Sequence, residues 1–185
     1  SAINAVGSGI ASTTVSSVAG DVPDAPVLTL TALPLNTIQL DWTTPTNNGF
    51  AITTYQIERS ADLGTTWVPV TSVNANTFQD PNLTNSVEYQ YKVSATNLVG
   101  SSAFSGVVQI VAGNSPGTVN PLTATTTSNT SIDLAWTTPN PNGYPVTGYF
   151  IEYSTDTGAT WSTLVANTQS LSIGYSDTGL TTGTI

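Results

Sequence analysis

The side chains that could do acid–base or nucleophilic chemistry are few and scattered in this sequence. Eleven acidic residues stand against two basic ones, and there is no His and no Cys. Ser–His–Asp catalysis and ligation of a metal by thiolate or imidazole are therefore excluded. The acidic residues form no visible opposed pair of the kind that glycosidases need. The sequence predicts a protein that is not an enzyme and that carries no metal or cofactor.

The charge balance also argues against two classes of partner. Arg59 and Lys92 are the only basic residues, and the net charge is −9. Binding to nucleic acid or to an anionic membrane surface needs clustered Lys and Arg, so both are excluded. The chain holds 20 serines and 34 threonines instead. This hydroxyl-rich, β-branched composition favours strands with one face in water.

Two eight-residue segments share the pattern Ser-x-Asp-x-Gly-x-Thr-Trp: residues 60–67 and 154–161. Each predicts a clasped hairpin, in which Asp ties down the turn, Gly adopts a backbone angle that other residues resist, and Trp anchors the hairpin. The clasp residues are Asp62, Gly64, Trp67, Asp156, Gly158 and Trp161. The pattern resembles the Asp boxes of sialidases, but a sialidase needs several arginines to hold a carboxylate, and Arg59 is the only one here.

A calcium ion could in principle bind acidic oxygens at the clasps or at a junction between units. Asp21 and Asp24 are the better pair for such a junction. The matching segment at residues 113–117 has no acidic residue, so we expect solvated acids there rather than a metal site.

The sequence repeats itself with a period of about 94 residues. Residues 41–45 (Asp-Trp-Thr-Thr-Pro) return as residues 135–139 (Ala-Trp-Thr-Thr-Pro), and Trp67 returns as Trp161. Residues 1–8 resemble residues 94–101, which makes them a third, partial copy. We therefore expect the final strands of one unit at residues 1–19, a complete unit at 20–112, and a unit without its last two strands at 113–185.

Within each unit the pattern is that of short strands. Ile38, Leu40 and Trp42 alternate with polar residues, and Tyr89, Tyr91 and Val93 do the same. Turn residues separate these runs, and no segment shows sustained helical periodicity. The sequence predicts an all-β fold: tandem, immunoglobulin-like, seven-stranded sandwiches of two sheets, without disulfides.

These strands resemble fibronectin type III domains over essentially the whole chain. Trp42, with Trp136 in the next copy, resembles the core tryptophan of the family, and Leu83 with Tyr89 resembles its tyrosine corner. The resemblance implies a structural role for these residues. It also implies a non-enzymatic module that serves in adhesion, as a spacer or as a scaffold.

Both ends of the chain align within the same strand, with residues 89–93 having no counterpart at either end. We expect either an excerpt from a long continuous array or separate chains that complement each other head to tail by strand donation. Neighbouring copies of the unit are the expected partners in both cases. The excerpt is favoured, because strand donation does not account for the five missing core residues.

Two kinds of surface residue are candidates for contacts. Phe50 and Tyr144 occupy equivalent loop positions, where an exposed ring could stack on carbohydrate or on another chain, or fold onto the base of its own loop. Asn82 and Asn129 begin glycosylation sequons, a weak signal in a chain so rich in Ser and Thr.

These features predict a structural unit of an extracellular or cell-surface array, such as a filament, sheath, surface layer or large adhesin. Two alternatives stay open: a spacer in a secreted carbohydrate-active enzyme, and a ligand-binding receptor ectodomain. Flanking sequence distinguishes the first alternative, and binding to glycans or matrix proteins distinguishes the second.

Overall fold

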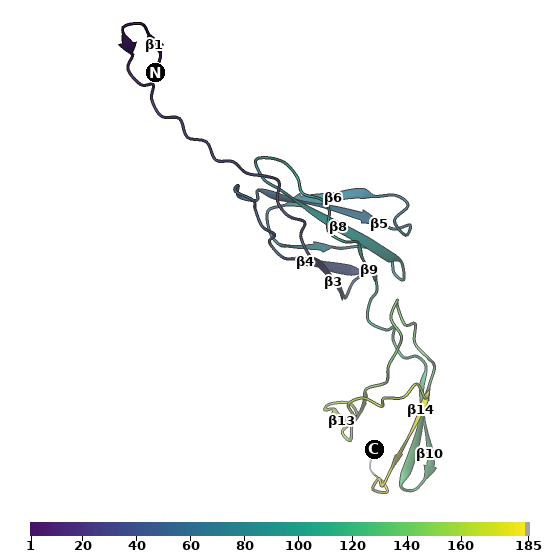
Figure 1. The fold of residues 1–185 in the computed structure, drawn as a ribbon. Helices are drawn as coiled ribbons and strands as arrows, with labels where there is room; N and C mark the ends of the chain where they lie inside the picture. The colour runs from purple at the N-terminus through teal and green to yellow at the C-terminus, as the bar shows by residue number, and fades with distance from the viewer. Residues whose placement is uncertain (184–185) are drawn as a thin grey trace.

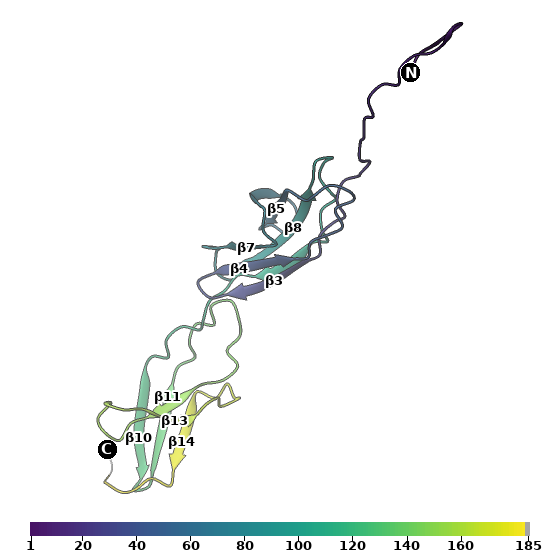
Figure 2. The same cartoon turned by 90° about the vertical axis from the view of Figure 1, so that its left-hand side faces the viewer.

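The computed structural model describes residues 1–183, which form strands, turns and extended segments. Because the described residues include no helix, they contain none that is long and apolar enough to cross a membrane. Figure 1 and Figure 2 show three parts in a row: an N-terminal arm (residues 1–19), a first unit (residues 20–112) and a second unit (residues 113–183).

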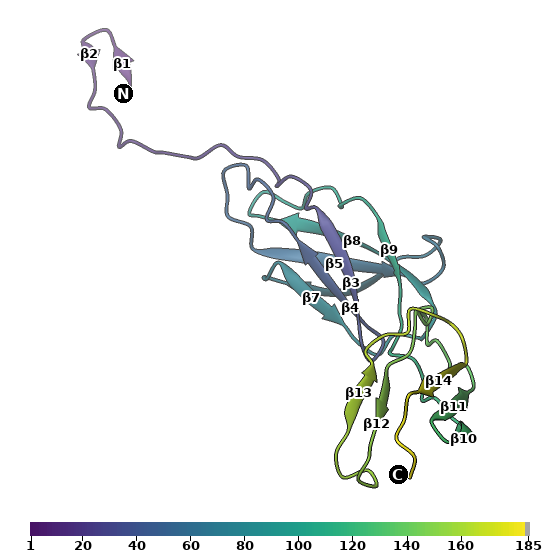
Figure 3. The ribbon, with the colours of Figure 1, turned by 90° about the horizontal axis from the view of Figure 1, so that it is seen from below.

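The first unit is a sandwich of two antiparallel sheets. Its seven strands are β3 (Leu28–Leu33), β4 (Thr37–Trp42), β5 (Thr54–Ser60), β6 (Val68–Val73), β7 (Thr77–Asp80), β8 (Glu88–Thr96) and β9 (Val108–Val111). One sheet has the order β3-β4-β7 and the other β6-β5-β8-β9. The two sheets face each other (Figure 3), so the predicted all-β sandwich is confirmed here.

The core of this sandwich follows from the alternation of the strands. Ile38, Leu40 and Trp42 of β4 point inward, as do Tyr91 and Val93 of β8. Side chains of one strand alternate between faces, so the polar residues between them face outward. The register also places Glu58 of β5 opposite Lys92 of β8 on the outer face.

The second unit repeats part of this arrangement. Its strands are β10 (Leu122–Ser128), β11 (Ser131–Trp136), β12 (Ile151–Tyr153), β13 (Ser162–Val165) and β14 (Gly174–Thr178). They form the sheets β10-β11-β14 and β12-β13. The register of β11 with β14 pairs Leu134 with Tyr175, as β4 and β7 pair Leu40 with Phe78. Among the described residues, this unit has no counterparts of β8 and β9.

The arm consists of a small hairpin and an extended segment. The hairpin is formed by β1 (Ile3–Asn4) and β2 (Gly7–Ser8), and all of its residues are exposed. It lies far from both sandwiches in Figure 1.

Candidate functional site

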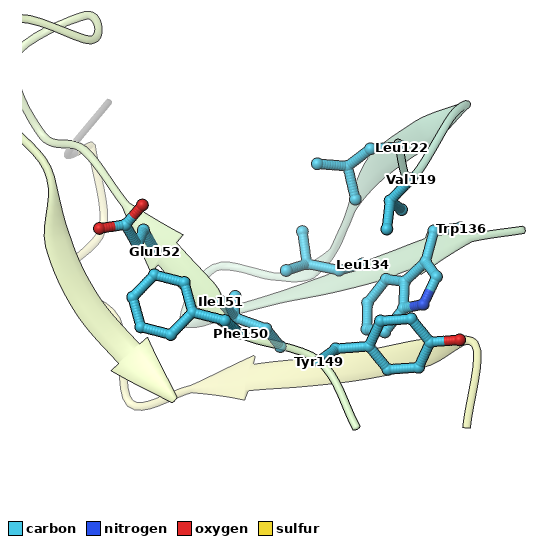
Figure 4. Close-up of a pocket in the computed structure, with 8 residues that line it drawn as sticks. All are labelled: Val119, Leu122, Leu134, Trp136, Tyr149, Phe150, Ile151 and Glu152. Atoms are coloured by element: carbon cyan, nitrogen blue, oxygen red, sulfur yellow. The ribbon is translucent and has the colours of Figure 1, made fainter. Parts of the chain in front are cut away.

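The second unit presents an open apolar face where the first has a closed core. Figure 4 shows the side chains that line it, with the rings of Trp136 and Tyr149 packed against each other and Leu134 beside them. The two rings meet edge to face, with centroids 4.9 Å apart. The full lining is Val119, Leu122, Leu134, Trp136, Tyr149, Phe150, Ile151 and Glu152.

Matched residues show how much of this face is uncovered. Leu28 of the first unit is 6% exposed, whereas Leu122, its equivalent, is 60% exposed. Leu40 is fully buried, while its equivalent Leu134 is only half-buried. The second unit therefore leaves in water apolar area that is buried in the first unit.

Two strands cover the corresponding face in the first unit. β8 pairs with β5 along its whole length and contributes Tyr91 and Val93, both fully buried. β9 then pairs with β8 and packs its Val108 and Ile110 against the core. A pair of strands with inward-facing aromatic and β-branched residues therefore has the shape and the apolar character needed to cover the open face.

The hairpin of the arm has the same construction as the turn between β8 and β9. In the first unit, the Asn97 side chain accepts from the backbone N–H groups of Val99 (2.9 Å) and Gly100 (3.2 Å). In the arm, the Asn4 side chain accepts from those of Val6 (2.9 Å) and Gly7 (3.1 Å). The arm thus contains an Asn-centred turn with the same hydrogen bonds as the turn that connects β8 to β9.

Both predicted clasps have the same hydrogen bonds. Asp62 Oδ1 accepts from the backbone N–H of Thr66 at 2.9 Å, and its Oδ2 accepts from the Thr66 hydroxyl at 2.6 Å. Ser60 Oγ donates to Asp62 and accepts from Gly64 N–H, and Gly64 has φ of 84°. These bonds, those from Thr66 first, lower the pKa of Asp62 to about 2.

The second clasp repeats the first. Asp156 accepts from the N–H and the hydroxyl of Thr160 at 2.8 and 2.6 Å, and its pKa is lowered to about 2 for the same reason. Gly158 has φ of 88°. The acidic side chains are occupied in holding the turn.

The tryptophans of the two clasps differ in their surroundings. The ammonium of Lys92 lies 4.2 Å from the ring centroid of Trp67 and 4.5 Å from that of Phe104, and it pairs with Glu58 at 3.0 Å. Trp161 is 60% exposed. In the first unit, β8 supplies the cation that covers the ring.

The remaining predicted structural residues lie in or beside the cores. Trp42 packs edge to face on Tyr55. The Tyr89 hydroxyl accepts from the backbone N–H of Thr84, just after the buried Leu83. Asn82 and Asn129, the sequon residues, are both exposed.

One polar cluster in the core was missed at the sequence level. Asp80 Oδ2 accepts from the Arg59 guanidinium at 2.8 Å and from the Tyr91 hydroxyl at 2.9 Å. Burial raises the pKa of Tyr91, and the charge of Asp80 adds to the effect. The available signal was the alternation of β5, since Arg59 has the inward parity of Tyr55 and Ile57.

The predicted contact aromatics and the junction acids lie where units meet. Phe50 packs over Gly20, and Tyr144 over Gly113. Asp24 accepts from the Asn48 amide at 3.2 Å, and Asp21 accepts from the N–H of Val22. Among residues 1–183, no group of three or more acidic, His or Cys side chains is arranged to hold a metal ion.

Comparison with known proteins identifies the fold of the first unit. The fibronectin type III domain family matches residues 24–111. Residues 24–111 are a fibronectin type III domain. The structure of the FN1–FN3 domains of chicken CNTN1 superposes with a TM-score of 0.54 at 20% identity, covering 89% of this chain and 60% of that one. This likeness shows the fold alone.

One curated relative is similar in sequence over both units. Exoglucanase B of Cellulomonas fimi is 30% identical over 173 residues, 88% of this chain. The chain spans 14% of that enzyme's length. Fibronectin type III domains are generally non-catalytic and are common in extracellular proteins.

Proposed function

We propose that this chain supplies non-enzymatic structural units to an extracellular repeat array, such as a filament, sheath, surface layer or large adhesin. The observation that carries the proposal is the repeated architecture of the two units. The second unit repeats the registers and turns of the fibronectin type III domain: Leu134 pairs with Tyr175 as Leu40 pairs with Phe78. Successive units of one fold joined by a short linker are the arrangement of a repeat array.

Neighbouring copies of the unit are the partners in this proposal, joined by continuation of the chain or by strand complementation. The hairpin of the arm supports it, because it keeps the Asn-centred turn that joins β8 to β9. The hydroxyl-rich surface, poor in charge, suits extracellular exposure.

The first experiment is the denatured mass of the native material, with the flanking sequence determined from it. A mass far above 19.1 kDa, with further repeats on both sides, is the expected result. A mass near 19.1 kDa would indicate that short chains assemble by exchanging strands. Flanking sequence without repeats, in a chain that does not assemble, would contradict the array.

Closure of the open face can be tested with a peptide of residues 88–111. We expect it to slow amide hydrogen exchange in residues 149–153, because β8 pairs with the equivalent β5. The matched control peptide carries Ser in place of Tyr91 and Val93, the two buried residues. Equal exchange with both peptides would contradict the assignment of this face.

A spacer in a secreted carbohydrate-active enzyme is the second candidate, favoured by the similarity to Exoglucanase B across both units. The units would then separate a catalytic domain from another module. A catalytic domain in the flanking sequence would support this candidate over the array.

A further inference from the structure

The linker at the boundary of the two units (residues 112–115) is held by a loop of the unit that follows it. The loop Asn142–Tyr144 lies along the linker: Asn142 O accepts from Asn114 N–H, and the Asn142 amide donates to Ser115 O, both at 2.8 Å. The Tyr144 hydroxyl donates to Val111 O at 2.6 Å. The Tyr144 bond ties the last strand of the first unit to this loop, and the two bonds of Asn142 hold the linker against it.

The preceding unit holds the same linker from the other side. In the turn between β3 and β4, Leu35 N–H donates to Asn114 Oδ1 and Asn36 N–H donates to Gly113 O, both at 3.2 Å. Leu35 and Asn36 have φ of 61° and 53°, which directs their N–H groups toward the linker. Positive φ at two successive residues is the geometry of a tight hairpin turn, and here it leaves both N–H groups paired with the linker.

Two glycines make the contact close. A Cβ on Gly113 would lie 2.8 Å from Asn142 O and from two ring carbons of Tyr144, closer than real Cβ contacts. Gly143 has φ of 99°, and a Cβ there would lie 3.0 Å from Ala112 O and Gly113 Cα. Because a Cβ at either glycine would lie 3.0 Å or less from atoms of the opposing segment, the linker and the loop can come this close only with glycine at both positions.

The same close contact occurs a second time, one repeat earlier. Asp21 N–H donates to Asn48 O at 2.9 Å, as Asn114 N–H does to Asn142 O. A Cβ on Gly20 would lie 2.6 Å from a ring carbon of Phe50. An Ala-Gly linker and an Asn-Gly-aromatic loop thus meet in the same way at both positions.

We propose that this joint is a rigid coupling between units, in which the turn at Leu35–Asn36 of one unit and the loop at Asn142–Tyr144 of the next clamp the linker and fix their relative orientation. The coupling deepens the proposed array function, since rigid joints let an array transmit shape over many units. It is nevertheless measurable within this chain alone, whatever flanks it.

The test is the distance distribution between two spin labels in the full chain. Cys is introduced at Thr31 and Thr125, exposed residues at equivalent positions of β3 and β10, in a chain that has no Cys of its own. We expect one narrow peak for the labelled protein and loss of that peak with Gly113→Ala. Gly117→Ala is the matched control, because its nearest Cβ contact would be an ordinary 3.5 Å.

Circular dichroism melting of each variant checks that the substitution has not unfolded the protein. A broad distribution in the labelled parent, or a peak as narrow in Gly113→Ala as in Gly117→Ala, would overturn the rigid coupling. Neither result would bear on the proposed array, which is tested separately by the denatured mass and the flanking sequence.

Discussion

At the scale of single residues, the two acidic clasps combine a strong local signal with a simple physical role. Asp62 and Asp156 each accept from a backbone N–H and a hydroxyl of the same Thr, four residues on. Only the ionised carboxylate can accept at both oxygens without competition from its own proton. The clasps therefore depend on ionisation.

This dependence gives the stability of the first unit a defined response to acid. The folded pKa of Asp62 is about 2, below its ordinary value of 3.8. A lowered pKa means that the stabilisation is fully present above about pH 4. It is lost as the pH falls through the folded value. We therefore expect the melting temperature of the parent to fall toward that of Asp62→Asn as the pH is lowered from 4 to 2. A constant difference over this range would contradict the role of the charge.

The buried cluster around Asp80 predicts a larger effect on stability. In Tyr91→Phe, the carboxylate of Asp80 loses a buried charge-assisted hydrogen bond, which should lower the free energy of unfolding by about 2 kcal/mol. Urea denaturation measures this. Tyr89→Phe is the control, because its hydroxyl accepts only from a neutral backbone N–H and should cost about 1 kcal/mol. A smaller loss for Tyr91→Phe than for Tyr89→Phe would count against the cluster.

At the scale of elements, the strands were readable from the sequence because their periodicity is strong. The alternation of Ile38, Leu40 and Trp42 predicts β4, and that of Tyr89, Tyr91 and Val93 predicts β8. The joint could not be read in the same way. Its contacts run between backbone groups, such as Asn36 N–H and Gly113 O, that lie far apart in the chain. Such bonds cannot be predicted from the pattern of side chains. The only related sequence feature is that Gly49-Phe50 recurs as Gly143-Tyr144.

The difference between a covered and an open sheet face predicts unequal effects of one substitution. Leu28→Ala should destabilise the first unit by about 2–5 kcal/mol, because Leu28 is buried in a closed core. Leu122→Ala should change the second unit by less than about 0.5 kcal/mol while its face is open. Hydrogen exchange resolved by segment measures each unit separately. With the peptide of residues 88–111 bound, the cost of Leu122→Ala should rise, and equal costs without peptide would show that the face is already closed.

At the scale of the whole molecule, the arrangement of the parts in a row depends on the joints (Figure 2). Gly20 lies against Phe50 as Gly113 lies against Tyr144. Asp21 stands at the position of Asn114, and both side chains accept from the next backbone N–H, at 2.7 and 2.8 Å. The segment at Gly20 therefore has the part of the joint that the following unit contributes. The carboxylate of Asp21 stands there in place of the Asn114 amide, which accepts from Leu35 N–H.

This half joint predicts the geometry of a longer chain. If a copy of residues 20–112 replaces residues 1–19, the turn at Leu35–Asn36 of the added unit can donate to Gly20 O and to the Asp21 carboxylate. Spin labels at residue 31 of the added unit and of the first unit should then give the same distance as labels at residues 31 and 125 of the present chain. Gly20→Ala in the longer chain should abolish the narrow peak, because its Cβ would meet the Phe50 ring. A narrow peak at a different distance would mean that a joint with Asp21 fixes a different angle between the two units than a joint with Asn114. Successive units would then not be related by one constant rotation.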